Sequence, residues 1–200
     1  MKNRSPLVAV VYDSASRGLG ELTGRTEQVA LSLGRGAECA GAAACLLRVP
    51  LQPADWILLD GADVIVFGAP TYMGSVSAAL KVFMEESLGR FLGRVWQDKL
   101  AAGFTNSAAM SGDKLSTLTQ LAVFAAQHGM LWVSLGQLAG WSTTAGRPED
   151  LNRLGSFLGL MAQSNADQGP TEVPPLADRA TAFEFGKRIA TLAARWADPQ

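Results

Sequence analysis

The sequence predicts an α/β protein in which helices cover both faces of a five-stranded parallel sheet. Strand-like and helix-like segments alternate along the chain, and this order favours parallel strands joined by crossover helices. The strand-like runs are continuously apolar and rich in β-branched residues, which is typical of strands covered on both faces. A chain of 200 residues can bury one such core, so we expect a single domain over residues 1–200.

The first half of the chain contains three of the predicted strands. A short helix is expected from Thr26, where Val29 and Leu33 share a face, and Gly34 and Gly36 are expected to end it. The strand-like runs are Leu7–Tyr12, Cys45–Val49 and Val64–Gly68, with a second short helix in residues 53–63.

The second half continues the alternation and then adds a segment that a minimal sheet does not need. Pro148–Ser164 has an apolar, helical pattern, and the polar stretch Ser164–Asp178 carries three prolines, which predicts a connecting loop. We expect this insertion to cover either the site or an oligomer interface. The regular elements are a helix after Ser75, a strand at Leu100–Phe104, a helix from about Asp113 to His128, a strand at Met130–Gly136 and a final amphipathic helix carrying Phe185 and Trp196.

Charge and composition exclude several classes of protein. Lysine plus arginine number 17 and aspartate plus glutamate number 18, so no one-signed field attracts nucleic acid or an anionic membrane. The apolar runs are too short to span a bilayer and no secretory signal is evident, so we expect a cytoplasmic protein. Cys39 and Cys45 have no nearby histidine or further cysteines, and we therefore expect no metal site.

The loop after the first strand has the chemistry of a phosphate site. Thr23, Gly24, Arg25 and Thr26 stand where the first helix begins, and hydroxyls with unpaired N–H groups at a helix N-terminus bind anions. Gly24 permits the close turn. A flexible glycine loop that only caps the helix through Thr23 or Thr26 remains an alternative.

A dinucleotide fingerprint is the other reading of this loop. Gly18, Gly20 and Gly24 nearly match the required glycine spacing. However, several residues separate Tyr12 from Gly18, and the second strand ends without an acidic residue, so this reading is disfavoured.

The second loop, Gly68–Lys81, combines a rigid turn with groups that suit a flat heteroaromatic ring. Its turn is expected from Pro70 and Gly74, and between them lie backbone amides, a hydroxyl, an aromatic ring and a polarizable thioether, from Thr71, Tyr72 and Met73. A turn into a helix capped by a serine explains the same residues without a ligand.

The third loop, Phe104–Lys114, follows the fourth predicted strand. Thr105, Asn106 and Ser107 provide hydrogen-bonding groups and Gly112 provides turning freedom before the next helix. The loop suits the polar edge of a ring, although alone it does not establish a ligand.

Together these segments resemble the flavodoxin-like FMN proteins, and within that fold they are most similar to the WrbA-type NAD(P)H:quinone oxidoreductases. The resemblance runs from about Val8 to Gly136 and implies a flavodoxin-like three-layer α/β/α sandwich with FMN as cofactor. It is carried by "TGRTEQVA", by "VIVFGAPTYMGSVSAALKVFMEE" and by "AQHGMLWVSLG".

The resemblance also implies which residues contact FMN. Ser14, Thr23, Gly24, Arg25 and Thr26 would surround the phosphate. The ribityl chain and ring would be contacted by Pro70, Thr71, Tyr72, Met73 and Gly74, and the other side of the ring by Thr105, Asn106, Ser107 and Gly112.

His128, the sole histidine, would approach the pyrimidine edge of the ring, and Phe91 would reach over a neighbouring subunit's flavin. From the residues alone, His128 is equally well explained as the last residue of a helix before Gly129. Tyr72 or His128 would polarise the carbonyl of the electron acceptor.

The activity implied is transfer of electrons from NADH or NADPH to quinones by a ping-pong flavin mechanism, in a nucleotide-binding flavoprotein that forms a homodimer or homotetramer. The alternative is a flavodoxin-like FMN electron carrier that shuttles electrons between protein partners without oxidising NAD(P)H. Such carriers dock through one-signed surfaces, and the near-neutral charge balance disfavours this alternative.

Overall fold

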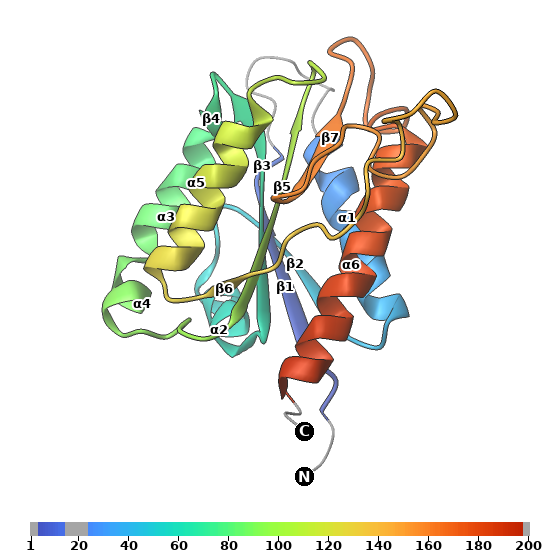
Figure 1. Ribbon diagram of the computed structural model, residues 1–200. Helices are drawn as coiled ribbons and strands as arrows, with labels where there is room; N and C mark the ends of the chain where they lie inside the picture. Colours follow the sequence, from blue (N-terminus) through green and yellow to red (C-terminus); the bar gives the residue numbers. More distant parts are fainter. Residues whose placement is uncertain (1–3, 15–23, 198–200) are drawn as a thin grey trace.

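A computed structural model describes residues 4–14 and 24–197, in which a parallel sheet lies between two layers of helices (Figure 1). Thr23 of the predicted phosphate site, and Gly18 and Gly20 of the disfavoured dinucleotide fingerprint, lie outside the described residues. The helices are α1 (Arg25–Cys39), α2 (Pro53–Gly61), α3 (Ala78–Glu86), α4 (Leu88–Leu92), α5 (Lys114–Gln127) and α6 (Leu176–Ala197).

The sheet has the strand order β2-β1-β3-β5-β6, with β7 also pairing β5 and β4 pairing β3. All pairs are parallel except β3 with β4. This is the doubly wound order 2-1-3-4-5, so the predicted fold and five-stranded core are confirmed. The strands are β1 (Leu7–Tyr12), β2 (Ala43–Arg48), β3 (Val64–Tyr72), β4 (Ser75–Val76), β5 (Leu100–Ser107), β6 (Leu131–Trp132) and β7 (Leu160–Gln163).

Alternate side chains of the buried strands feed two cores. Val8 and Val10 of β1 pack with α1 and α6 on one face, whereas Ala9 and Val11 pack with α2, α3 and α5 on the other. Strict alternation of direction along a strand explains why each predicted strand is apolar throughout. No helix within residues 4–14 and 24–197 is long and apolar enough to cross a membrane.

The prediction that glycines end the first helix is wrong. Helix α1 continues through Gly34 and Gly36 to Cys39. A Cβ at Gly36 would lie 1.9 Å from the carbonyl oxygen of Phe183 in α6, and one at Gly186 would lie 2.0 Å from the carbonyl oxygen of Leu33. These glycines therefore serve the close crossing of α1 and α6 rather than a helix stop.

The last predicted strand is also wrong in extent. Only Leu131–Trp132 of Met130–Gly136 forms a strand, and it pairs with the beginning of β5. The end of β5 pairs instead with β7, which lies inside the segment Pro148–Ser164 that was predicted to be helical. The fifth strand is thus built from two pieces, and residues 133–159 are inserted between them.

Candidate cofactor site at the carboxyl edge of the sheet

The ends of β1, β3 and β5 meet at one edge of the sheet, where α1 also begins. A cleft of about 200 Å³ lies there, and in an open α/β sheet this edge is where ligands bind. It gathers residues from all three predicted loops. The residues that line it are Ser14, Arg25, Thr26, Pro70, Thr71, Tyr72, Asn106, Ser107, Ala108, Ser164 and Ala166.

The first turn of α1 forms one end of the cleft. Gly24 has a positive φ of 96°, which glycine adopts readily, and its N–H donates to the carbonyl of Ser14 over 3.3 Å. The Ser14 hydroxyl accepts from the N–H of Glu27 at 2.9 Å. The N–H groups of Arg25 and Thr26 lie in the first turn of the helix and have no acceptor in the part of the chain that the structure describes, so this turn offers donors to an anion.

Arg25 supplies the strongest indication that this end expects an anion. Its terminal nitrogen donates to the carbonyl of Ala166 at 2.9 Å, but its Nε is buried without an acceptor in the described part of the chain. A buried donor that stays unpaired is costly, and more so when it carries charge. A phosphate in the cleft would provide the missing acceptor, so the residues present fit a phosphate-bearing cofactor.

Glu27, the acidic residue in the same turn, is held by a tyrosine. The hydroxyl of Tyr12 donates to its Oε1 at 2.9 Å. Burial, and then this hydrogen bond, raise the pKa of Tyr12, so the phenol keeps its proton at neutral pH. A hydrogen bond from a neutral phenol therefore holds the carboxylate of Glu27 beside the predicted phosphate position.

The second predicted loop is a hairpin between β3 and β4. Tyr72 pairs with Ser75, and Met73 and Gly74 between them have φ of 50° and 75°, the two positive values of a type I′ turn. Pro70 lies within β3 rather than in the turn. Tyr72 is 43% exposed and lines the cleft, whereas Met73 is fully exposed at the tip of the hairpin.

A group of threonine hydroxyls supports the floor of the cleft. Thr71 Oγ1 is 2.7 Å from Thr105 Oγ1 and 2.8 Å from Thr117 Oγ1, and all three side chains are buried. Thr105 does not line the cleft. Thr105 lies beneath Thr71 and bonds to its hydroxyl. In this position it supports a residue of the cleft and does not itself face the cleft, where it was predicted to contact the ligand.

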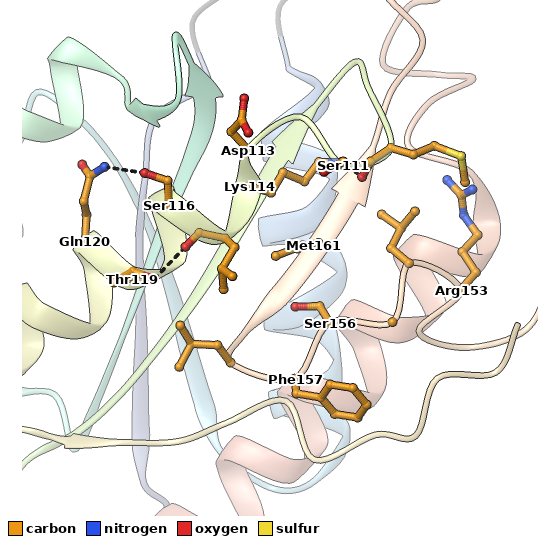
Figure 2. Close-up of a pocket in the computed structure, with 15 residues that line it drawn as sticks. Ser111, Asp113, Lys114, Ser116, Thr119, Gln120, Arg153, Ser156, Phe157 and Met161 are labelled. Carbon is orange, nitrogen blue, oxygen red and sulfur yellow. Dashed lines mark hydrogen bonds between the residues drawn. The ribbon is translucent and has the colours of Figure 1, made fainter. Parts of the chain in front are cut away.

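Of the third predicted loop, Phe104–Lys114, the residues up to Ser107 belong to β5 and Lys114 begins α5; the turn between them, Ala108–Asp113, is here called the ring loop. Gly112 is needed in it because a Cβ would lie 2.3 Å from Ser107 Oγ and its φ is 51°. Ala108 lines the cleft, but Gly112 does not. Met110, Ser111 and Asp113 instead line a wider hollow of about 1030 Å³ between α5 and residues 153–158 (Figure 2).

The structure does not bring His128 to this cleft. His128 follows α5 and lies near the beginning of β5, where its ring centroid is 4.4 Å from that of Trp96. Asn106 is at the far end of β5, and six residues of strand span roughly 20 Å. Within one chain, the structure therefore places His128 away from the residues that line the cleft.

The proton on His128 can be assigned from its neighbours. Ser87 Oγ donates to the carbonyl of Met84 at 2.7 Å and is 3.0 Å from His128 Nε2, so the serine accepts from an Nε2–H. Nδ1 is then the unprotonated nitrogen, and it is buried without a partner among residues 4–14 and 24–197. Burial lowers the pKa of His128, which disfavours the imidazolium that would polarise a carbonyl through Nδ1.

His128 borders a separate pocket of about 330 Å³ at the opposite end of the sheet. Phe91, which is 44% exposed, lines the same pocket, and its ring meets His128 edge to face at a centroid distance of 6.0 Å. Two residues that the resemblance assigned to flavin contacts, His128 at the pyrimidine edge and Phe91 from a neighbouring subunit, are thus neighbours.

Three residues that line the cleft, Ala108, Ser164 and Ala166, were not in the predicted set. Ser164 Oγ donates to Asn106 Oδ1 at 3.0 Å, and Ala166 accepts from Arg25. Both follow β7, and the helical reading of residues 148–164 concealed that they end a strand beside β5. The polar, proline-rich composition of the following segment indicated a loop but not its position.

Comparison with known proteins supports a common family for this chain. Residues 57–142 match the family described as NADPH-dependent FMN reductase. The chain is 39% identical to "Flavodoxin FldP" of Pseudomonas aeruginosa over 173 residues, which cover 84% of this chain and 90% of the relative. It is 27% identical to an "NAD(P)H dehydrogenase (quinone)" of Archaeoglobus fulgidus, over 86% of this chain and 93% of that protein.

A solved structure agrees with these relatives. The flavodoxin, WrbA-like protein from Agrobacterium tumefaciens superposes with a TM-score of 0.72 and 36% identity, over 94% of this chain and 98% of the other. The alignments span nearly all of both chains, and the cleft lies where this fold binds its cofactor. The chain therefore belongs to the flavodoxin-like FMN proteins of the WrbA type.

Proposed function

We propose that this FMN oxidoreductase transfers electrons from NADH or NADPH to quinones, with both substrates reacting in turn at one site. The observation that carries the proposal is the convergence of the three loops on one cleft that contains an unpaired guanidinium N–H. Electron transfer chemistry comes from the flavin when it is bound, while the protein binds, orients and shields it.

The start of α1 is proposed to hold the phosphate. Arg25 Nε, the hydroxyl of Thr26 and the N–H groups of the first turn offer donors within one turn of helix. Ser14 contributes indirectly, because its hydroxyl already accepts from Glu27 and so fixes the turn. Thr23 and Gly24 are proposed to complete the phosphate end, although Thr23 lies outside the described residues.

The ring is proposed to lie between the β3–β4 hairpin and the ring loop. Tyr72 and Met73 present exposed aromatic and thioether surface at the hairpin, and Asn106 and Ser107 line the opposite wall of the cleft. Gly74 and Gly112 set the conformations of the two loops through positive φ. Tyr72 also stays the proposed donor to an acceptor carbonyl.

A role for His128 requires a second subunit. Its distance from the cleft along β5 excludes contact within one chain, whereas its pocket with Phe91 opens at the surface. We therefore propose that a homodimer or homotetramer brings this pocket over a neighbour's cleft. Sedimentation of the FMN-loaded protein tests this, and a monomer at assay concentration would remove His128 and Phe91 from the site.

The alternative function is a carrier that passes electrons between proteins. It is favoured by the 39% identity to a protein named flavodoxin. A balance of 17 basic and 18 acidic residues does not provide the one-signed surface on which docking of such carriers depends. The two functions differ in one property, which is oxidation of a nicotinamide.

Two measurements test the proposal in order. Apoprotein titrated with FMN should quench flavin fluorescence saturably, and absence of saturation would refute both functions. The loaded protein is then mixed with NADH or NADPH and benzoquinone. Oxidation of the nicotinamide that depends on both protein and quinone supports the enzyme, whereas FMN binding without oxidation identifies the carrier.

The proposal includes a cytoplasmic location, where NADH and NADPH are available, and one functional domain over residues 1–200. It includes no nucleic acid, membrane or metal as partner. Limited proteolysis of the loaded protein tests the domain assignment, because a single domain should resist cleavage between the cleft-forming segments.

A further inference from the structure

Four successive carbonyl groups of the ring loop, those of Ala108–Ser111, accept hydrogen bonds from the protein beneath the loop. The ammonium group of Lys114 donates to two of these carbonyls. The bonds are Gln163 Nε2 to Ala108 O at 2.8 Å, Lys114 Nζ to Ala109 O at 2.6 Å, Lys114 Nζ to Met110 O at 2.8 Å and Lys114 N to Ser111 O at 3.2 Å.

The amide N–H groups of the same peptides therefore face the other way. In a trans peptide the C=O and the following N–H point in opposite directions. Carbonyls of Ala108–Ser111 that point inward place the N–H groups of residues 109–112 outward. In the described part of the chain none of these four N–H groups has a protein acceptor.

Lys114 is unusual in being completely buried at the first position of α5. Its charge is faced by Asp178 of α6 and by Arg153, which form an ion pair of 2.7 Å with each other. Gln163 joins this pair to the ring loop, because its backbone N–H donates to Asp178 and its side chain donates to Ala108. The ring loop thus rests on a buried polar network that carries one uncompensated cation.

We propose that Lys114 is a positioning residue that fixes the ring loop with its N–H groups outward and stabilises the negative charge that the flavin gains when it is reduced. The inference rests on the proposed binding of FMN. Outward-facing amide N–H groups can donate hydrogen bonds to the electron-rich edge of the reduced ring. A cation buried behind these amides makes the electrostatic potential at that edge more positive without touching it. Neither effect requires Lys114 to touch the cofactor.

The test compares two lysines that make the same kind of bond at opposite ends of the sheet. Lys114→Met removes the cation below the ring loop. Lys99→Met is the matched control, since Lys99 Nζ also donates to two backbone carbonyls, Asp60 O at 2.8 Å and Ala62 O at 2.5 Å. Each variant is titrated with oxidised FMN, and the midpoint potential of the bound flavin is measured by anaerobic spectroelectrochemistry.

We expect Lys114→Met to weaken the binding of reduced FMN about tenfold more than the binding of oxidised FMN, as for loss of a charge-assisted interaction. The two-electron midpoint potential then falls by about 30 mV. Lys99→Met should leave the potential at the wild-type value. An unchanged potential in folded Lys114→Met, or an equal fall in Lys99→Met, overturns the inference.

A second variant keeps the inference testable if Lys114→Met does not fold. Lys114→Gln keeps an amide donor for a loop carbonyl but removes the charge, and the same fall in potential is expected. A potential equal to that of wild type in this variant also overturns the inference. If the wild-type protein binds no FMN, the proposed function itself fails. If it binds FMN but replacing Lys114 leaves the midpoint potential unchanged, only the inference about Lys114 fails.

Discussion

Arg25→Met tests the assignment of the phosphate end most sharply. The guanidinium lines the cleft, where one terminal nitrogen donates to Ala166 and Nε is buried without an acceptor among the described residues. If that Nε donates to the FMN phosphate, its loss removes one charge-assisted hydrogen bond. Such bonds contribute about 1.5–3 kcal/mol. Arg25 is only half-buried, and solvent screening favours the lower end of that range.

The expected result is a dissociation constant for FMN that rises about tenfold. Riboflavin lacks the phosphate, so its affinity should change little, and fluorescence quenching measures both ligands in one format. Arg35→Met is the control, because Arg35 lies on the exposed face of the same helix. Raising the ionic strength should reduce the difference in the dissociation constant for FMN between wild type and Arg25→Met.

Riboflavin also distinguishes the loss of a phosphate contact from a general loosening of the cleft. Arg25→Met frees the carbonyl of Ala166 and so loosens the segment that follows β7. A general loosening would weaken FMN and riboflavin equally. Equal losses, or unchanged FMN binding, would refute the placement of the phosphate beside Arg25.

The remaining predictions concern the same turn, the helix crossing and the buried lysine. Thr26→Glu should abolish FMN binding, because a carboxylate would compete with the phosphate, and Thr26→Ser should retain it in the same quenching assay. Gly36→Ala should lower the free energy of unfolding in urea by about 3 kcal/mol, since its Cβ would lie 1.9 Å from the backbone of Phe183, whereas Gly34→Ala meets a side chain at 3.1 Å and should cost far less. Burial lowers the pKa of Lys114 from 10.5 to about 8. Between pH 8 and pH 10.5 the unfolded chain therefore binds more protons than the folded one. Over this range the free energy of unfolding of the wild type should rise with pH by about 3 kcal/mol relative to that of Lys114→Met. Urea unfolding at pH 7.5, 9 and 10.5 checks this, and parallel pH profiles for the two proteins would contradict it.

Local patterns in the sequence were sufficient for the strands that carry the site. Leu7–Tyr12 was predicted to the residue, and β3 and β5 begin where their apolar runs begin. Because parallel strands share an edge for their carboxyl ends, placing the three loops together followed from strand order alone. The cleft contains Arg25, Tyr72 and Asn106 for this reason.

Pairings between distant segments were not predictable in this way. Strand β7 has the leucine and methionine content of a helix, and only its register with β5, more than fifty residues earlier, makes it extended. The same holds for Gly36, whose partner Phe183 is in the last helix. Local propensity suggested a helix stop at a position where tertiary contact required the absence of a side chain.

The placement of His128 was recoverable from the sequence. A crossover helix runs antiparallel to the strands it joins, so a residue at its carboxyl end lies at the amino edge of the sheet. His128 ends such a helix, and the structure accordingly packs it on Trp96, just before β5. The resemblance assigned it a flavin contact without regard to which edge it occupies.

The ordered mixing of the FMN-loaded protein with its two substrates under anaerobic conditions tests the central claim most directly. The account predicts that NADH or NADPH alone bleaches the visible absorbance of the flavin, and that benzoquinone added afterwards restores it in equimolar amount. Flavin that stays oxidised in the presence of either nicotinamide, yet is reduced by dithionite and reoxidised by a redox protein, would contradict the enzyme and establish the carrier.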